Sequence, residues 1–365
     1  MDVLRLAGVP GVGKSAVAWA VAQHLAQEGV PLGYVDIDQL GMCYPAPPDD
    51  PDRWVMKETA LARLAAQFHR TGVERLVVSG VAEPILPPAT SGHPTVSLWL
   101  DADEATRRER LAARRWPTEQ LDATLAVGTE EARTAHPSWT RVDTDGRSLG
   151  ETVHAVLELA APVPRAIPTA VSEDDFAPRA GVTGRVIWIT GPRCAGSSSI
   201  GWAMANTLWG NGQRAGFVDV AQLGFVWNVG QAIAVRNAAE VQGLFAAAGA
   251  RIFIAVAPFE IEPDAVEAAF PGAEVAFIRL DADDRSRRDR ALQRARGDGG
   301  ALLAGDDLIG APPPVIDEVV AADARERPTP VRPGERIVDT SGLSVSEVMV
   351  QVRALVDPRR RAMPD

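Results

Sequence analysis

Short runs of apolar residues alternate along this chain with longer segments whose apolar positions recur every three or four residues. The runs predict β-strands and the longer segments predict amphipathic helices. In the first part of the chain the predicted strands cover residues 3–7, 32–36, 75–79, 95–100 and 139–143, and the predicted helices cover 14–28, 54–71, 103–115, 118–133 and 148–160. This alternation is typical of βαβ units, so it predicts an α/β fold with a parallel sheet covered by helices on both faces.

The same pattern returns in the second part of the chain, where strands are predicted near 186–190, 214–219, 251–256, 274–280 and 335–339. The two parts also share residues in one order: Trp19 with Trp202, Val35-Asp36 with Val218-Asp219, Leu100-Asp101 with Leu280-Asp281, and Val142-Asp143 with Val338-Asp339. We interpret this as a tandem duplication. The predicted divisions are a first domain at 1–160, a proline-rich linker at 161–183, a second domain at 184–357 and a tail at 358–365.

A glycine-rich loop joins the first predicted strand to the first predicted helix. It reads Gly8-Val-Pro-Gly11-Val12-Gly13-Lys14-Ser15-Ala16 and fills every position of the pattern G-x-x-x-x-G-K-[ST]. In such a loop the backbone amides wrap a phosphate, the lysine reaches the β- and γ-phosphates, and the hydroxyl ligates Mg²⁺. The helix N-terminus adds partial positive charge. The sequence therefore predicts a site for ATP and Mg²⁺.

The corresponding loop of the second part is incomplete. Gly191-Pro-Arg-Cys-Ala-Gly196-Ser197-Ser198 keeps the glycines, but Ser197 stands where the first part has Lys14. Further on, Ala221 stands where the first part has Asp38. We expect Mg·ATP to bind the first domain only.

Two carboxylates follow the second predicted strand, at Asp36 and Asp38. Ligands of parallel α/β sheets bind beyond the carboxyl ends of the strands. We expect one carboxylate to face the metal and its waters and the other to face the phosphate acceptor. Capping of a turn is the alternative role for an aspartate at a strand end.

These features together resemble the nucleoside-monophosphate-kinase-like group of P-loop kinases, which includes adenylate, shikimate, gluconate and adenylylsulfate kinases and chloramphenicol phosphotransferase. The resemblance implies a five-stranded parallel sheet in the order 2-3-1-4-5 in each of two P-loop domains, and a mobile lid. It also implies that Asp38 orients or deprotonates an acceptor hydroxyl while Asp36 acts on Mg²⁺ through water, beside Ser15. One departure is the third strand's end, Val78-Ser79-Gly80, which lacks the acidic residue often found in nucleotide kinases.

Arg107, Arg110 and Arg114 are spaced to share one face of a predicted helix. By the same resemblance, Arg107 and Arg110 are expected to contact transferring phosphates when a lid closes. A solvated helix with ion pairs to nearby glutamates is the alternative. The segment after Asp38 carries Tyr44, Arg53 and Trp54 between prolines, and we expect it to form a wall of the acceptor site, with packing at the surface as the alternative.

Composition limits the classes of function. The net charge of −11 lacks the basic excess of a non-specific nucleic-acid binder. No apolar run is long enough to cross a membrane, and the two cysteines, Cys43 and Cys194, have no metal-binding spacing, so a cytoplasmic protein is predicted. Lys14 and Lys57 are the only lysines among 365 residues.

Two functions remain open from the sequence. The first is ATP-dependent phosphorylation of a small hydroxyl-bearing metabolite, antibiotic or nucleotide by the first domain, with the second domain as a pseudo-kinase packed against it. The second is a non-catalytic or regulatory ATP-binding module. We also expect the pocket of the second domain to be filled or rewired, because Trp227 and Asn228 replace Tyr44 and Pro45 there.

Overall fold

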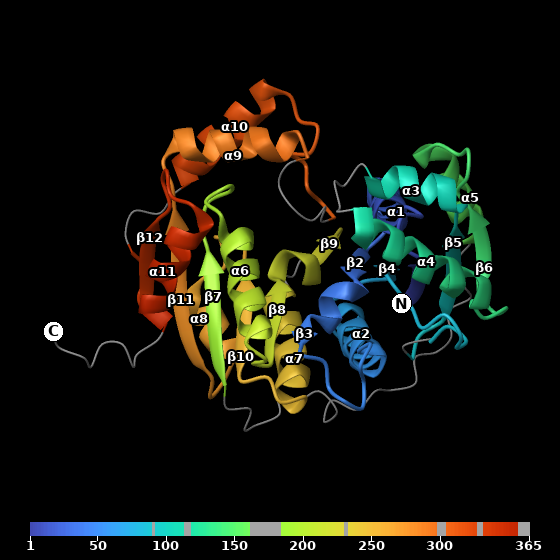
Figure 1. Cartoon of the computed structure of the whole chain (residues 1–365), viewed down its shortest axis with the longest axis horizontal. Helices are drawn as coiled ribbons and strands as arrows, with labels where there is room; N and C mark the ends of the chain where they lie inside the picture. The colour runs from blue at the N-terminus through green and yellow to red at the C-terminus, as the bar shows by residue number, and fades with distance from the viewer. Residues whose placement is uncertain are drawn as a thin grey trace.

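The computed structural model describes residues 1–89, 92–112, 118–160, 184–229, 233–297, 304–326 and 331–356. The predicted linker at 161–183, the tail at 358–365 and Arg114 lie outside these residues. The strands form two six-stranded sheets, which lie side by side in the molecule (Figure 1).

The first half builds strands and helices close to the predicted ranges. Its strands are β1 Asp2–Ala7, β2 Leu32–Asp36, β3 Cys43–Tyr44, β4 Arg75–Ser79, β5 Thr95–Asp101 and β6 Thr140–Asp143. Its helices are α1 Lys14–Gln27, α2 Trp54–Arg70, α3 Glu104–Ala112, α4 Thr118–Thr134 and α5 Leu149–Leu159, with a 3₁₀ turn η1 at Ile37–Gly41. The predicted strands are thus confirmed, and β3 is an addition that apolar patterning did not indicate.

The second half follows the same order. Its strands are β7 Arg185–Thr190, β8 Ala215–Asp219, β9 Phe225–Trp227, β10 Ile252–Val256, β11 Glu274–Asp281 and β12 Glu335–Asp339. Its helices are α6 Ser197–Gly210, α7 Ala234–Ala247, α8 Pro263–Ala269, α9 Asp284–Ala295, α10 Pro313–Glu326 and α11 Val345–Val356, with a 3₁₀ turn η3 at Val220–Leu223.

Each sheet has six strands, and the sixth comes from the other half. The orders are β6-β5-β1-β4-β2-β9 and β12-β11-β7-β10-β8-β3. Five strands of each sheet are parallel, and β9 and β3 pair antiparallel with β2 and β8. The prediction of a five-stranded sheet in each half is therefore wrong in strand number, because each half donates a short antiparallel strand to the edge of the other.

The two exchanged strands pair in equivalent registers. Val226 lies opposite Gly33, and Cys43 lies opposite Gly216. Neither glycine can carry a side chain, because an added Cβ would approach the ring of Phe68 to 2.7 Å in one half and that of Phe245 to 2.3 Å in the other. Covering an exposed sheet edge in this way removes the open strand that otherwise pairs with other chains.

The hydrophobic core is continuous between the halves. One cluster joins residues of α2 and the first sheet to residues of α7 and the second sheet, and Arg63 of α2 lies 3.5 Å from Glu240 of α7. On the far face of the first sheet, α1 and α5 form a cluster that takes in Phe225 and Trp227 of β9. Met42 enters the matching cluster of the second half. Apolar burial on this scale holds the halves together.

Candidate active site

The glycine-rich loop lies between β1 and α1, as the sequence predicts. Gly11 and Gly13 both have φ of +91°, and Gly13 is the N-cap of α1. Gly8 is required by space, since an added Cβ would lie 2.4 Å from the carbonyl oxygen of Leu100. The Nζ of Lys14 donates to the carbonyl oxygen of Val9 at 3.0 Å and so lies across the loop. Val12 is buried under the loop, whereas Ala16 is exposed on the first turn of α1.

The two predicted carboxylates lie beside this loop. Asp36 ends β2, and its Oδ1 accepts the backbone amide of Asp38 at 2.9 Å. The hydroxyls of Ser15 and Ser79 lie 3.4 and 3.2 Å from its Oδ2. The structure therefore brings the predicted metal-binding pair, Ser15 and Asp36, together.

Burial, followed by the charge of the nearby Asp38 carboxylate, raises the pKa of Asp36 to about 7, against the lowering effects of the Asp38 amide, Lys14 and Ser79. The phenol of Tyr34 lies 2.8 Å from the Ser79 hydroxyl, and burial followed by the charge of Asp36 raises its pKa. A cation bound beside Asp36 would favour the ionised carboxylate.

The Ser15 hydroxyl in the first turn of α1 and the Asp36 carboxylate at the end of β2 fit Mg²⁺, which binds proteins through one or two oxygen ligands and takes the rest from phosphates and water. Among the described residues, no group of three or more His, Cys, Asp or Glu side chains forms a metal site of its own. The donors present therefore suit Mg²⁺ that arrives with a nucleotide.

Lys57 is a site residue that the sequence analysis did not assign. Its Nζ lies 3.6 Å from Oδ1 of Asp38 and 4.5 Å from the ring centre of Trp54. Lys57 is only 6% exposed, whereas the Asp38 side chain is 47% exposed. Burial lowers the pKa of Lys57, and Asp38 opposes that effect. Both lysines of the chain thus lie near the Asp36–Asp38 pair. The scarcity of lysine was the one feature of the sequence that could have pointed to Lys57 as a site residue.

The two predicted lid arginines take different positions. Arg107 is 2% exposed, and its guanidinium donates to the Leu125 carbonyl and the Thr129 hydroxyl of α4, both at 2.9 Å. Arg110 donates to the hydroxyl and carbonyl oxygens of Thr144, at 2.9 and 3.0 Å, beneath the loop. The predicted shared face of guanidiniums is therefore not formed: Arg107 points into the packing between α3 and α4.

The second half has arginines in the positions of both Arg107 and Arg110, although its loop has no counterpart of Lys14. Arg287 is fully buried and donates to the carbonyl of Val320, and Arg290 donates to Thr340 and to the carbonyl of Ala195. The second half makes the same arginine contacts although its loop has no counterpart of Lys14. These contacts therefore stabilise the fold of both halves and do not depend on a complete phosphate-binding loop.

The second carboxylate has different residues around it from those around Asp36. Asp219 matches Asp36 and accepts the amide of Ala221, and burial raises its pKa to about 6. An added Cβ on Gly41 would meet Lys57, and one on Gly224 would meet Ala234, so Ala234 occupies the place of Lys57. The same correspondence between the elements of the two halves gives the other replacements: Ser197 for Lys14, Ala221 for Asp38, Phe217 for Tyr34 and Val256 for Ser79.

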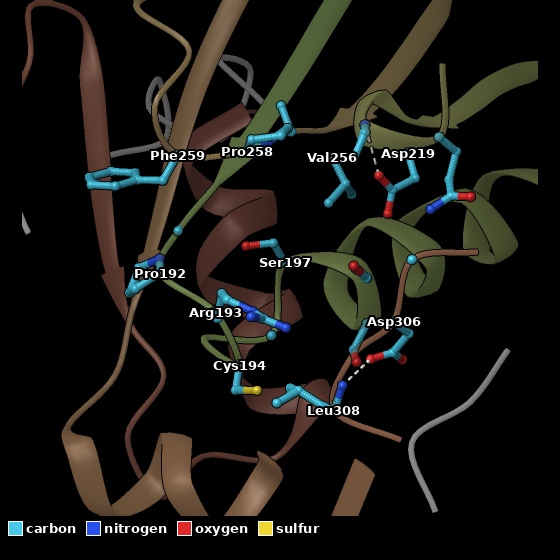
Figure 2. A pocket seen from close by; sticks show the side chains of 18 of the residues that line it. Pro192, Arg193, Cys194, Ser197, Asp219, Val256, Pro258, Phe259, Asp306 and Leu308 are labelled. Atoms are coloured by element: carbon cyan, nitrogen blue, oxygen red, sulfur yellow. Dashed lines mark hydrogen bonds between the residues drawn. The ribbon is translucent and has the colours of Figure 1, made fainter. Parts of the chain in front are cut away.

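The structure places Tyr44 of the predicted acceptor wall at an exchanged edge, and it shows that the second pocket is not filled. Tyr44 lies in β3, and its ring centre is 4.9 Å from that of Trp209 in the second half. The guanidinium of Arg53 lies over the Tyr44 ring, 4.2 Å from its centre. Trp227 lies in β9 against Trp19 of the first half. Both aromatic residues therefore belong to the exchanged edges. The second half holds an open cavity of about 1120 Å³, lined by the second loop and the end of β8 (Figure 2).

No helix among the described residues is long and apolar enough to span a membrane. The loop, the carboxylates at the strand ends and the parallel sheets are those of P-loop α/β proteins. A family model described as an AAA domain matches residues 5–136, which hold the first loop and both carboxylates. No curated protein matches the chain.

Two solved structures are similar to part of the chain. One is an unliganded sugar kinase from Janibacter sp. HTCC2649, with 19% identity, a TM-score of 0.31, and coverage of 44% of this chain and 96% of that one. The other is APE1195, with 18% identity, a TM-score of 0.32, and coverage of 45% and 96%.

Proposed function

We propose that the first half transfers the γ-phosphoryl group of Mg·ATP to the hydroxyl of a small molecule, and that the second half is a duplicated, non-catalytic copy. The observation that carries the proposal is the set of charged residues beside the complete loop. Lys14, Asp36, Asp38 and Lys57 lie together in the first half, and of these only the counterpart of Asp36 remains in the second. A module that only binds ATP has no need of Asp38 and Lys57 at the acceptor side.

The reaction forms a bond between the acceptor oxygen and the γ-phosphorus and breaks the bond from that phosphorus to the bridging oxygen of ADP. Asp38 accepts the proton of the acceptor hydroxyl, and its partial exposure leaves room for that hydroxyl. Lys14 moves from the Val9 carbonyl to the β- and γ-phosphates when nucleotide binds. Ser15, and Asp36 through water, would hold Mg²⁺, which would neutralise phosphate charge when bound.

The arginines have separate roles in this proposal. Arg110 lies under the loop, where its charge supports the bound phosphates and orders the Thr144 turn. Arg107 is a positioning residue that fixes α4 against the loop, because an added Cβ on Gly11 would lie 3.0 Å from Arg107 and one on Gly128 would lie 2.9 Å from its guanidinium. Lys57 is also a positioning residue, since it holds the carboxylate of Asp38 by charge.

The test compares Asp38→Asn with the wild-type chain in a single-turnover transfer of labelled γ-phosphate to a panel of hydroxyl-bearing metabolites. Transfer is expected to fall at least about 10²-fold, the scale of a positioned base, while Mg·ATP affinity stays within about threefold. Asp36→Asn is the matched variant and should instead weaken the dependence on Mg²⁺. Transfer at the wild-type rate by Asp38→Asn would contradict the acceptor role.

One observation favours a second candidate function, a regulatory ATP-binding module. The turn that carries Asp38 touches the second half directly, because the side chain of Gln39 accepts the backbone amide of Asp219 at 3.2 Å. Nucleotide bound in the first half would thereby act on the second. This candidate is favoured if the panel yields no phosphorylated product while ATP is slowly hydrolysed.

A further inference from the structure

The cavity of the second half lies where parallel α/β sheets bind ligands. It is bounded by the loop after β7, by the ends of β8 and β10, and by residues 304–308. Figure 2 shows the Asp219 carboxylate and Val256 on one side and Arg193 and Cys194 of the loop on the other. Its volume of about 1120 Å³ is slightly above the usual range for small-molecule pockets, about 300–1,000 Å³.

Smaller side chains than those of the first half line this space, and of the two strand-end carboxylates one remains. Ser197 and Ala221, which replace Lys14 and Asp38, both line the cavity, and Asp219 is retained at its edge. In the described part of the chain the Asp219 carboxylate forms no ion pair; it accepts the amide of Ala221 at 3.1 Å and also the amide of Gln222. The charge of Arg294 acts on it, but the guanidinium of Arg294 is paired with Asp306. The first half supplies two ammonium groups at the equivalent place, and the second half supplies none.

The remaining charges of the lining disfavour a polyphosphate. Among the described residues that line the cavity, four are arginines and five are carboxylates. Three of the arginines are ion-paired with carboxylates of the same lining: Arg193 with Asp307, Arg294 with Asp306, and Arg332 with Glu262. The fourth, Arg290, is engaged with Thr340.

The loop itself is also less suited to phosphate than its counterpart. The amide of Ala195 donates to the carbonyl of Pro192 at 3.0 Å, so it does not point into the space that a phosphate would occupy. Apolar residues complete the lining, among them Val256, Pro258, Phe259 and Leu308. A ligand here therefore needs a cationic group for Asp219 and an apolar or ring-bearing body for this wall.

We propose that the cavity of the second half is a binding site for a small ring-bearing primary amine, whose ammonium group pairs with Asp219 in the place of the missing lysines. This site is separate from the proposed phosphoryl-transfer site, and its test needs no transfer activity.

The experiment measures binding of ring-bearing primary amines, glucosamine and tryptamine among them, each beside its N-acetylated counterpart. Saturation-transfer NMR and calorimetry are carried out on the full chain. At least one amine is expected to bind at least about tenfold more tightly than its acetylated counterpart, because acetylation removes the charged hydrogen bond. Binding should persist in Lys14→Ala, which disables the first loop.

Two variants locate the site. Asp219→Asn keeps the shape of the side chain and should weaken amine binding at least about tenfold, whereas Asp36→Asn, the matched change in the first half, should leave it unchanged. Ser198→Trp places a ring in the cavity from an exposed position and should abolish binding even if Asp219→Asn proves unstable. The proposal is overturned if no amine of the panel exceeds its acetylated counterpart, if Ser198→Trp binds normally, or if Asp36→Asn has the effect expected of Asp219→Asn.

Discussion

The side-chain oxygen of Gln39 accepts the backbone amide of Asp219, at 3.2 Å, and so joins the turn that carries Asp38 to a strand end of the other half. Gln222 is the counterpart of Gln39, but among the described residues it makes no equivalent hydrogen bond to the first half. Its side-chain amide donates instead to the carbonyl of Ala304, within the second half. The two halves are therefore equivalent in topology but not in the contacts between their sites.

This contact predicts a measurable contribution to stability. Gln39→Ala leaves an amide at the interface without its partner and should lower the free energy of unfolding by about 0.5–1.5 kcal/mol. Urea denaturation of the full chain measures the difference, and Gln23→Ala on the exposed face of α1 provides the control. Equal stability of Gln39→Ala and the wild type would show that water replaces the bond at no cost.

Mg·ATP should bind at one site per chain. The second loop lacks the lysine and turns one amide inward, and loss of a single charged phosphate contact costs about 1.5–3 kcal/mol, or roughly ten- to a hundredfold in affinity. Calorimetry of the wild type should give a stoichiometry near one, and Lys14→Ala should remove that site. Two comparable sites, or ATP binding retained by Lys14→Ala, would show that the second half binds nucleotide.

Lys57 should affect the acceptor step and leave nucleotide binding intact. Lys57→Met removes the charge beside Asp38 but keeps a long apolar side chain on Trp54, so transfer should fall about ten- to a hundredfold while Mg·ATP affinity changes less than about threefold. Lys57→Arg restores the charge and should recover part of the rate. The pH dependence of transfer separates this role from a structural one, because loss of the neighbouring cation should move the acidic limb of the profile upward. An unchanged profile in Lys57→Met would contradict it.

Asp36 should make the protein less stable as the pH rises. Its pKa is raised from its ordinary value of 3.8 to about 7 in the folded chain, so the native state holds a proton that the unfolded state has released. Stability due to this group is therefore full only below about pH 3.8, declines as the pH rises toward 7, and stays low above it. After allowance for the partial exposure of Asp36, Asp36→Asn should stabilise the chain by about 1–2 kcal/mol at pH 8 and by much less at pH 4.

Thermal melts of both proteins at the two pH values test this expectation. Asp219→Asn should behave in the same direction with a smaller effect, since the pKa of Asp219 is raised only to about 6. A variant Asp36→Asn that is less stable than the wild type at pH 8 would show that the ionised carboxylate is paired more strongly than its surroundings indicate.

Residues 1–160 alone should be far less stable than the full chain. Their separation uncovers the edge of β2, which β9 covers, and the face of α2 that packs against α7. We expect the melting temperature to fall by at least about 10 °C, or the fragment to associate through the open edge. Scanning calorimetry and light scattering measure both outcomes. An isolated first half that melts with the full chain and stays monomeric would mean that the shared core contributes little.

Local patterns in the sequence determined most of the elements and half of the site. Strands such as β2 and β10 are continuous apolar runs, and the glycine-rich loop is defined by residues adjacent in sequence, so both are visible without a structure. The Ser15–Asp36 contact was also predictable, because both residues lie at positions fixed by the loop and by the end of the neighbouring strand.

Tertiary structure alone decided the rest. β3 and β9 have two and three residues, too few for a periodic signal, and they exist only because the edge of the other half's sheet supplies their hydrogen bonds. Tyr44 and Trp227 thus belong to an interface that no local pattern marks. The Lys57–Asp38 pair depends on how α2 packs against η1, and the second cavity depends on which side chains are missing from a space that several distant segments enclose. Pairings between residues distant in sequence are set by packing of the whole chain, and composition and periodicity carry no record of them.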